Sequence, residues 1–243
     1  MPETSIIMTA YRRADLLANT LESIYRQTFK DFEVIVVEDG DDGGAIRQLC
    51  ERYGLRYFQR KNRPDVLFSN PAIPTNIGIR RAEGEVVIIQ NAECLHHSPE
   101  LIEALTAPHR TEKNLAVFAS VSARSPDGTH WHWYVHPEKD CRKRPFFFCG
   151  SVRREHVWRV QGLCEALPFY GFDDDLLALQ LQRAGVTFKF LADIVAHHQW
   201  HSATGCWGIQ KNQEIFREIM DKFMRHELPI ETNAGREWGS LDS

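Results

Sequence analysis

Residues 5–42, SIIMTAYRRADLLANTLESIYRQTFKDFEVIVVEDGDD, decide the fold of this chain. The stretch begins with a short apolar run at Ser5–Thr9 and ends with a β-branched run at Phe32–Val37, the pattern of buried strands. Between them, apolar residues recur with the period of an amphipathic helix, at Leu17, Leu21 and Ile24. Acidic residues follow the second run directly. Because open α/β sheets bind ligands at the carboxyl ends of their strands, the stretch predicts strand, helix, strand and a binding site.

Length and composition favour one large α/β domain, or one domain with a small appendage. The chain has 243 residues, and 43% of them are hydrophobic, which is enough for a core. Alternating strand and helix patterns through the first half predict a mostly parallel sheet with helices on both faces. We expect strands at 55–58, 85–90 and 115–122, a loop at 61–74, and helices after Gly43 and at 75–82 and 99–107.

The second half departs from this alternation. Aromatic and polar residues alternate over 131–136, which predicts a strand on the substrate face rather than at the sheet edge. The charged loop 137–145 is either a solvated loop or a mobile lid, and its basic residues are Lys139, Arg142, Lys143 and Arg144. We expect helices at 153–160, 176–184 and 209–224, short strands at 188–191 and 194–196, and a loose tail at 233–243.

Charge, cysteines and hydropathy exclude several classes of protein. No window approaches 18 consecutive apolar residues, and Met1–Thr4 lacks the features of a signal peptide, so we expect a cytoplasmic chain without a transmembrane helix. The six cysteines form no Cys-x-x-Cys pair, which predicts free thiols in a reducing compartment. The net charge of −4 provides no general attraction to polyanions.

The opening stretch resembles the start of the family 2 glycosyltransferases, which have the GT-A fold and use nucleotide sugars. The matching motifs are Ile6–Arg12, Gln27–Phe29 and Val36–Asp41, and the resemblance continues to about residue 201. It implies a Rossmann-like α/β fold, with a mostly parallel sheet, helices on both faces and a smaller acceptor-side region. Within a single domain it implies a nucleotide-binding half at 1–122, an acceptor-side half at 123–232 and a tail at 233–243.

The resemblance places a nucleotide at the carboxyl ends of the first strands. It implies that Tyr11 stacks on the base and that the Asp39 carboxylate accepts from a base N–H, and such stacking contributes about 1–3 kcal/mol. The residues implied in nucleotide binding are Thr9, Ala10, Tyr11, Arg12, Glu38, Asp39, Asn76 and Asn91. The alternative for Asp39 is a turn-forming aspartate before Gly40.

A metal site is implied where the family has Asp-x-Asp. This chain has Asn91-Ala92-Glu93 there, which keeps the spacing and the oxygen ligands but loses one charge. Mn²⁺ and Mg²⁺ accept carboxylate, amide and water oxygens, so we expect Glu93 and Asn91 to bind such an ion more weakly. His198 and then His201 are further candidate ligands, because some family members have a histidine after a late strand. A polar turn in a catalytically inactive relative is the alternative.

The third motif, Gly171–Asp174, resembles the family's Gly-x-Glu-Asp at a helix start. In inverting members a carboxylate there takes the proton from the acceptor hydroxyl, a contribution of about 10²–10⁴-fold. We assign this role to Asp174, and acceptor positioning to Asp173. Acids also favour a first helical turn through the helix dipole alone, and that interpretation is preferred for Asp175.

The sequence therefore predicts a metal-dependent transfer of sugar from a nucleoside-diphosphate sugar, UDP-sugar favoured, to an acceptor hydroxyl. The acceptor class stays open among a saccharide, a lipid-linked sugar, a protein, a small metabolite and a modified nucleic acid base. One alternative is a sugar nucleotidyltransferase, although Thr9–Arg13 lacks the glycine-rich phosphate loop of that class. The other is an inactive nucleotide- or sugar-binding relative. The sequence leaves stereochemistry and oligomeric state open.

Overall fold

A computed structural model describes residues 1–61, 69–140, 144–169, 171–202 and 208–241, and a sheet of nine strands lies at its centre. The strand order is β3-β2-β1-β4-β8-β6-β9-β5, and β7 pairs with β6 off this path. The strands are β1 (Thr4–Ala10), β2 (Phe32–Asp39), β3 (Arg56–Arg60), β4 (Val86–Asn91), β5 (Cys94–His96), β6 (Leu115–Arg124), β7 (His130–Val135), β8 (Cys149–Arg153) and β9 (Thr187–His198).

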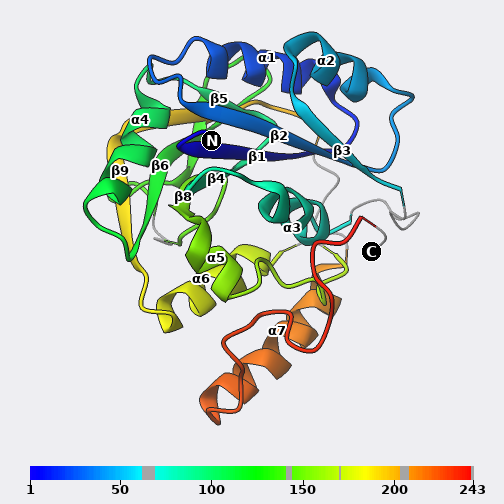
Figure 1. The fold of residues 1–243 in the computed structure, drawn as a ribbon, viewed down its shortest axis with the longest axis vertical. Helices are drawn as coiled ribbons and strands as arrows, with labels where there is room; N and C mark the ends of the chain where they lie inside the picture. The colour runs from blue at the N-terminus through cyan, green and yellow to red at the C-terminus, as the bar shows by residue number, and fades with distance from the viewer. Residues whose placement is uncertain (62–68, 141–143, 170, 203–207, 242–243) are drawn as a thin grey trace.

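Helices cover both faces of this sheet, as predicted. Figure 1 shows α1 and α2 on one face and α3, α5 and α6 on the other, with α7 projecting beyond α6. The helices are α1 (Ala14–Tyr25), α2 (Ala45–Tyr53), α3 (Ala72–Arg81), α4 (Leu101–Thr106), the 3₁₀ helix η1 (Ala107–Arg110), α5 (Arg154–Arg159), α6 (Asp173–Arg183) and α7 (Ile209–Met224).

Most long strands run in one direction, which confirms the predicted mostly parallel sheet. β1 pairs in parallel with both β2 and β4, and β2 pairs in parallel with β3. β8 is antiparallel to both β4 and β6, so β6 runs parallel to β4, and β9 is parallel to β6. The carboxyl ends of six strands therefore meet at one edge of the sheet.

The core forms where the apolar pattern of residues 5–42 predicts it. Ile6, Ile7 and Met8 of β1 are at most 1% exposed, and burying a side chain of this size contributes about 1.5–3 kcal/mol. Gly78 lets α3 approach β1 closely, because a Cβ there would lie 2.5 Å from Cγ2 of Ile7. This close packing carries the start of α3 to the site edge.

Three predicted boundaries in the chain need correction. α3 begins at Ala72, inside the expected loop, because Pro74 lies in the first helical turn, where a missing N–H breaks no bond; residues 62–68 of that loop lie outside the described part. The two expected short strands form one strand, β9, whose register with β6 shifts between Ala119 and Ser120. β5, which the sequence did not predict, folds back after β4 and pairs with the end of β9.

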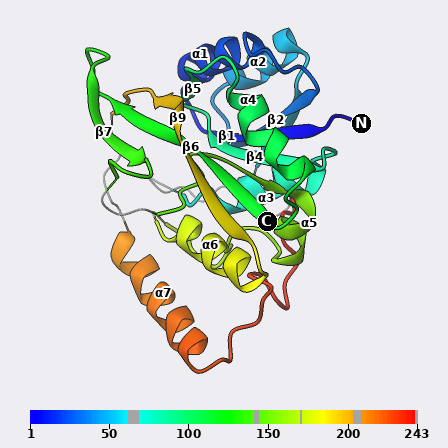
Figure 2. The ribbon, with the colours of Figure 1, turned by 90° about the vertical axis from the view of Figure 1, so that its left-hand side faces the viewer.

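β7 forms a hairpin with β6 and pairs antiparallel to it, with two register shifts. Figure 2 shows this hairpin projecting from the body of the molecule. Trp131 near its tip is 67% exposed, whereas Tyr134 stacks on Phe148 with ring centroids 4.5 Å apart. The base of the hairpin is therefore attached to the site edge, and its tip is exposed to solvent.

The expected loose tail is wrong for the described residues 233–241. Trp238 is 7% exposed, its ring lies 5.5 Å from that of Trp158, and Nη1 of Arg80 donates to its carbonyl oxygen at 2.8 Å. Asn233 is 2% exposed. The segment is polar overall, but the burial of its one aromatic side chain, Trp238, holds the tail against α3 and α5.

The structure also bears on the cysteines and on membrane insertion. Four cysteines are buried free thiols, namely Cys50, Cys94, Cys149 and Cys164. Cys141 and Cys206 lie outside the described residues. Within the described ranges, none of the helices has the length and apolarity needed to cross a bilayer.

Candidate functional site

The strand registers bring the residues of the first motifs side by side. Thr9 lies opposite Val37 of β2 on one side and opposite Asn91 of β4 on the other. Ala10 lies opposite Glu38. Oγ1 of Thr9 is also 3.0 Å from Oγ1 of Thr75 in α3. The predicted nucleotide edge is thus formed by β1, β2 and β4 together with the start of α3.

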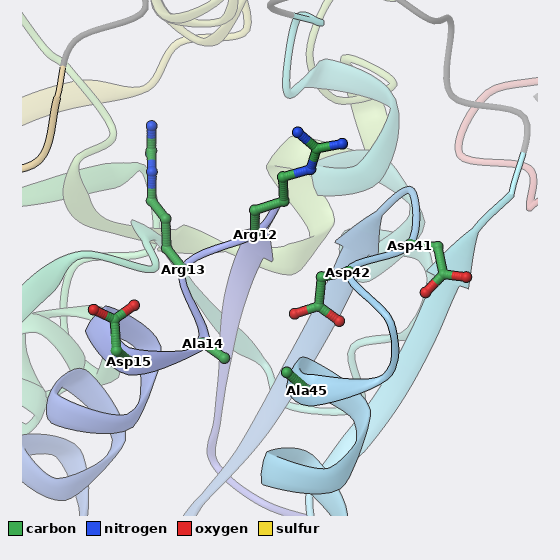
Figure 3. A pocket seen from close by; sticks show the side chains of 7 residues that line it. All are labelled: Arg12, Arg13, Ala14, Asp15, Asp41, Asp42 and Ala45. Carbon is green, nitrogen blue, oxygen red and sulfur yellow. The ribbon is translucent and has the colours of Figure 1, made fainter.

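The turn from β1 to α1 has an unusual backbone. Arg12 and Arg13 both have positive φ, 48° and 107°, a conformation that costs a non-glycine residue on the order of 1–3 kcal/mol. The guanidinium of Arg12 lies 4.9 Å from the ring centroid of Tyr11. Figure 3 shows Arg12, Arg13, Asp41 and Asp42 around an open hollow of about 470 Å³. Strain of this kind, held beside a hollow, is typical of a binding loop.

Glu38 stabilises the turn after β2 through hydrogen bonds of its carboxylate. Its side chain is buried, one carboxylate oxygen accepts from the hydroxyl of Tyr57, and the other accepts from the backbone N–H of Asp42 at 2.9 Å. Burial raises the pKa of this carboxyl group. Asp42 in turn accepts from the N–H of Ile46 at 3.2 Å, at the start of α2. The structure therefore does not support the expectation that Glu38 contacts a nucleotide.

An acidic cluster forms in this turn from residues other than the predicted metal ligands. Among the described residues, carboxylate oxygens of Glu38, Asp41 and Asp42 lie within 4.8 Å of one another. Asp41 accepts from the N–H of Gly43 at 2.9 Å, and the other two are bonded as described above. The cluster therefore builds the turn before α2 through hydrogen bonds to the backbone.

Asp39 lies at the predicted position with a partner that the sequence did not suggest. Nη1 of Arg60, at the end of β3, lies 3.0 Å from its Oδ1. The two side chains are only 4% and 5% exposed. Removing one member of such a buried pair leaves an uncompensated charge and costs about 3–5 kcal/mol. Arg60 thus fixes the orientation of Asp39 at the edge.

Glu93 is held by a second arginine. Nη1 of Arg13 lies 2.6 Å from Oε1 of Glu93, and the side chains are 35% and 13% exposed. β5 follows Glu93 directly, with Cys94 opposite His198 of β9. The backbone N–H of Gln199 donates to the carbonyl of Glu93 at 3.0 Å. The fold-back of β5 therefore brings Glu93 and His198 together, although about a hundred residues separate them in sequence.

His198 lies in an aromatic surround at the end of β9. Its ring centroid is 5.3 Å from Tyr134, 5.6 Å from Phe148 and 5.3 Å from His201. Burial lowers the pKa of His198 to about 4, so the ring is neutral at physiological pH and keeps a nitrogen lone pair. The backbone N–H of Asn91 donates to the carbonyl of Phe148 at 3.0 Å, which places Asn91 beside the same aromatic residues.

The three aspartates open α6 as predicted, and their surroundings differ. Asp174 accepts from the backbone N–H of Phe147 at 3.1 Å through Oδ1. Burial, and then the neighbouring Asp173, raise its pKa well above the ordinary value. Burial raises the pKa of Asp173 to about 6. Asp175 instead pairs with Arg144, whose Nε lies 2.8 Å from Oδ1. Asp175 therefore has a structural partner at the head of α6.

The segment 146–148 connects the third motif to the second. The N–H of Phe147 bonds to Asp174, while the carbonyl of Phe148 accepts from Asn91 and its ring faces His198. The aspartates of α6 and the Asn-x-Glu turn therefore border one region of the edge. Sequence spacing alone does not predict this proximity.

Asn76 does not belong to the site. It is fully buried, and its amide donates to the carbonyl of Leu163 at 2.9 Å and to Glu165 at 2.8 Å. Its oxygen accepts from the N–H of Leu163 at 2.8 Å. These bonds attach α3 to the chain after α5, so the expectation that Asn76 binds nucleotide is corrected.

The structure describes two of the four basic residues of the predicted charged loop 137–145, namely Lys139 and Arg144. Arg144 is bonded to Asp175, and Nζ of Lys139 lies 5.1 Å from the ring centroid of Trp133. Arg142 and Lys143 lie outside the described residues. Arg144 thus contributes to the head of α6.

Sequence reasoning missed the two arginines that hold the site carboxylates. Arg13 and Arg60 carry no motif, and each becomes a partner only when its strand end meets that of its neighbour. The signal in the sequence that could have indicated these arginines was the need to balance the charge of a buried carboxylate. A carboxylate expected to be buried at a strand end needs a cation nearby, and Arg60 lies two residues beyond the strand expected at 55–58.

A known protein family matches this chain. The sequence model described as Glycosyl transferase family 2 matches residues 5–167, more than half of the chain. The match ends before Asp173 and Asp174. The putative teichuronic acid biosynthesis glycosyltransferase TuaG of Bacillus subtilis is 22% identical over 238 residues, covering 88% of this chain and 89% of TuaG. The chain spans 14–16% of the length of three Rickettsia relatives and 70% of that of a Bacillus subtilis relative.

Two solved structures share the fold. Staphylococcus aureus TarS in complex with UDP superposes with a TM-score of 0.66 at 17% identity, over 82% of this chain and 60% of that one. The mannosyltransferase PcManGT from Pyrobaculum calidifontis, in complex with GDP-Man and Mn²⁺, superposes with a TM-score of 0.65 at 20% identity. The superposition covers 94% of this chain and 66% of PcManGT. The predicted α/β fold of the GT-A type is confirmed.

Proposed function

Because this chain belongs to glycosyl transferase family 2, we propose that it moves a sugar from a nucleoside-diphosphate sugar to an acceptor hydroxyl. The observation that carries the proposal is the junction at Phe147–Phe148. It joins a carboxylate with a raised pKa, Asp174, to a turn bearing possible metal ligands, Asn91 and Glu93. A base and a site for a charged leaving group at one edge are what glycosyl transfer requires.

We infer that the donor is a UDP-sugar, bound across Thr9, Ala10, Tyr11, Arg12 and Asp39. The UDP complex of TarS and the GDP-Man complex of PcManGT support a nucleotide sugar of this kind. Asp39 is already oriented by Arg60, so one carboxylate is prepared to accept from a base. In this proposal, residues 1–122 supply the nucleotide side and 123–232 the acceptor side.

In this proposal a divalent cation binds beside β5, although among the described residues only Glu38, Asp41 and Asp42 form a group of three acidic, cysteine or histidine side chains with donor atoms within 4.8 Å of one another. The donor set is the Glu93 carboxylate, the Asn91 amide and the neutral imidazole of His198, with His201 next to it. Mn²⁺ suits the carboxylate and amide oxygens of this set. The ion would neutralise charge on the diphosphate leaving group. Nη1 of Arg13 lies 2.6 Å from Oε1 of Glu93 in this structure, so the ion competes with Arg13 for that oxygen.

The chain's own residues then supply the proton chemistry. Asp174 takes the proton of the acceptor hydroxyl when it is deprotonated, and a raised pKa makes that carboxylate a stronger base than an exposed aspartate. The N–H of Phe147 holds one carboxylate oxygen and leaves the other to accept the proton. Asp173 positions the acceptor, and Arg144 stabilises the head of α6 through Asp175.

Hydrolysis of a panel of UDP- and GDP-sugars with Mn²⁺ tests the proposal, combined with calorimetric titration of the nucleoside diphosphates. Turnover of one donor supports the transferase. A second candidate, a nucleotide-binding relative without turnover, is favoured by Asn91 and by the Arg13–Glu93 pair. It predicts nucleotide binding without hydrolysis. Absence of binding to any nucleoside diphosphate would refute both. The glycine-free turn Tyr11–Arg13 disfavours a sugar nucleotidyltransferase.

A further inference from the structure

The turn before α6 is unusual because its geometry is not fixed by the helix that follows. Gly171 and Phe172 have positive φ, 87° and 69°, directly before the first helical residue, Asp173. Phe172 bears a side chain in a region that L residues rarely adopt. Two successive left-handed residues need support from outside the helix, or the head of α6 would relax.

Asn212 of α7 supplies support from one side. Its side chain is completely buried. Its Oδ1 accepts from the N–H of Phe169 at 3.1 Å, and its Nδ2 donates to the carbonyls of Phe169 at 2.6 Å and Gly171 at 3.0 Å. One buried amide thus bonds to three backbone groups of Phe169 and Gly171.

Asn70 supplies support from the other side, immediately before α3. It is 3% exposed, and its Nδ2 donates to the carbonyl of Phe169 at 2.7 Å and to Oδ1 of Asp173 at 3.5 Å. Its Oδ1 accepts from the N–H of Ala72 at 2.9 Å, which fixes the amide orientation. The carbonyl oxygen of Phe169 therefore accepts hydrogen bonds from the side-chain amides of both Asn70 and Asn212.

We propose that Asn70 and Asn212 are positioning residues for the reaction, because they hold the backbone of Phe169 and Gly171 and with it the carboxyl groups of Asp173 and Asp174. The inference rests on the proposed transferase function. Asn70 belongs to the nucleotide-side half, and Asn212 belongs to α7. The positions of the Asp173 and Asp174 carboxyl groups therefore depend on both parts of the chain. A displacement of about 1 Å at such a site can lower turnover about a hundredfold.

The chain contains a matched control for Asn212. Asn233 is 2% exposed and makes the same set of bonds elsewhere: Nδ2 donates to the carbonyls of Gln161 at 2.7 Å and Leu163 at 2.8 Å, and Oδ1 accepts from Glu165 N–H at 3.0 Å. Asn212→Ala and Asn233→Ala therefore remove equivalent amides, and only the first holds the aspartates.

The test compares Asn70→Ala, Asn212→Ala and Asn233→Ala in the full chain by UDP-sugar hydrolysis, UDP titration and thermal unfolding. We expect the two positioning variants to lose about tenfold to a hundredfold in kcat while their Kd for UDP stays within about twofold. Asn233→Ala should lower Tm as much as Asn212→Ala and keep kcat within about twofold. Equal loss of kcat in Asn212→Ala and Asn233→Ala would overturn the proposal, as would unchanged kcat in Asn70→Ala.

Hydrogen exchange at the Phe147 amide separates this inference from the transferase function. That N–H is bonded to Asp174, so its exchange rate reports the carboxylate's position in a protein with or without turnover. Asn70→Ala should accelerate the exchange on the order of tenfold, and Asn233→Ala should leave it unchanged. If the wild-type chain hydrolyses no donor, the exchange result alone decides. Unchanged exchange in Asn70→Ala would then refute the positioning role.

Discussion

Replacing Asp173 by asparagine is expected to stabilise the fold at neutral pH while impairing its function. Burial raises the pKa of Asp173 to about 6 from an ordinary value of 3.8. The charged form is therefore less favourable in the folded protein than in the unfolded chain. Asp173→Asn keeps the shape of the side chain and removes the charge.

The magnitude follows from linkage between protonation and folding. A pKa difference of about two units corresponds to at most about 3 kcal/mol, and solvent screening at this partly exposed side chain reduces it to about 1–3 kcal/mol. Below the unfolded-state pKa, Asp173 is protonated in both states and does not lower the stability of the wild type. From about pH 4 to 6 the unfolded chain loses this proton more readily than the folded protein, so the free energy of unfolding falls. Above that range the full loss of stability is present. The stability gain of Asp173→Asn should therefore grow from pH 4 and level off near pH 7.

Thermal unfolding of both proteins from pH 4 to 8 measures this gain. For a chain of this size, about 1 kcal/mol shifts Tm by about 2–4 °C, so we expect Asp173→Asn to unfold about 2–12 °C higher at pH 7. Asp15→Asn is the matched control, because Asp15 is also an acid in a first helical turn and its side chain is exposed. A Tm difference that is constant across the pH range, or a loss of stability at pH 7, would refute the reasoning.

Four further changes test the site. Asp174→Asn should lower kcat about 10²-fold or more and leave UDP affinity nearly unchanged; near-full kcat would leave Asp174 as a helix-start residue only. Glu93→Ala should abolish turnover with the fold intact, and full wild-type activity in EDTA would contradict the metal role. Arg13→Gln should tighten Mn²⁺ binding in the absence of nucleotide, because it removes the competing cation at Glu93; calorimetry showing weaker binding would contradict this. Arg60→Ala should cost about 3–5 kcal/mol in chemical denaturation, because it leaves Asp39 buried without its guanidinium, and a loss below 1 kcal/mol would contradict the buried pair.

The local sequence of residues 5–42 was sufficient to predict the first strands and helix. Ile6–Met8 and Val34–Val37 became buried strands, and Leu17, Leu21 and Ile24 became the buried face of α1. Such elements are predictable because their period and apolar content are local properties. The fold class followed from the alternation of these elements, since parallel strands joined by helices have few other arrangements.

Roles that depend on partners were harder to predict. Asn76 was expected at the nucleotide and is a buried structural amide, and Glu38 was expected there and is held by Tyr57 and the backbone of Asp42. A motif places a residue type at a strand end or helix start, but the bonds it makes depend on what packs against it. The tail around Trp238 was misjudged for the same reason, because its burial depends on α3 and α5.

The sequence by itself determined most of the strands and helices, the family and the motifs that reach the carboxyl edge, because these follow from short-range pattern and chain connectivity. Only the tertiary structure decided which charges meet there. Arg13 reaches Glu93 across 80 positions, and Asn212 reaches Phe169 across 43. Hydrogen bonds and ion pairs act over a few ångströms, so they exist only after the sheet and its helices have brought distant segments into contact.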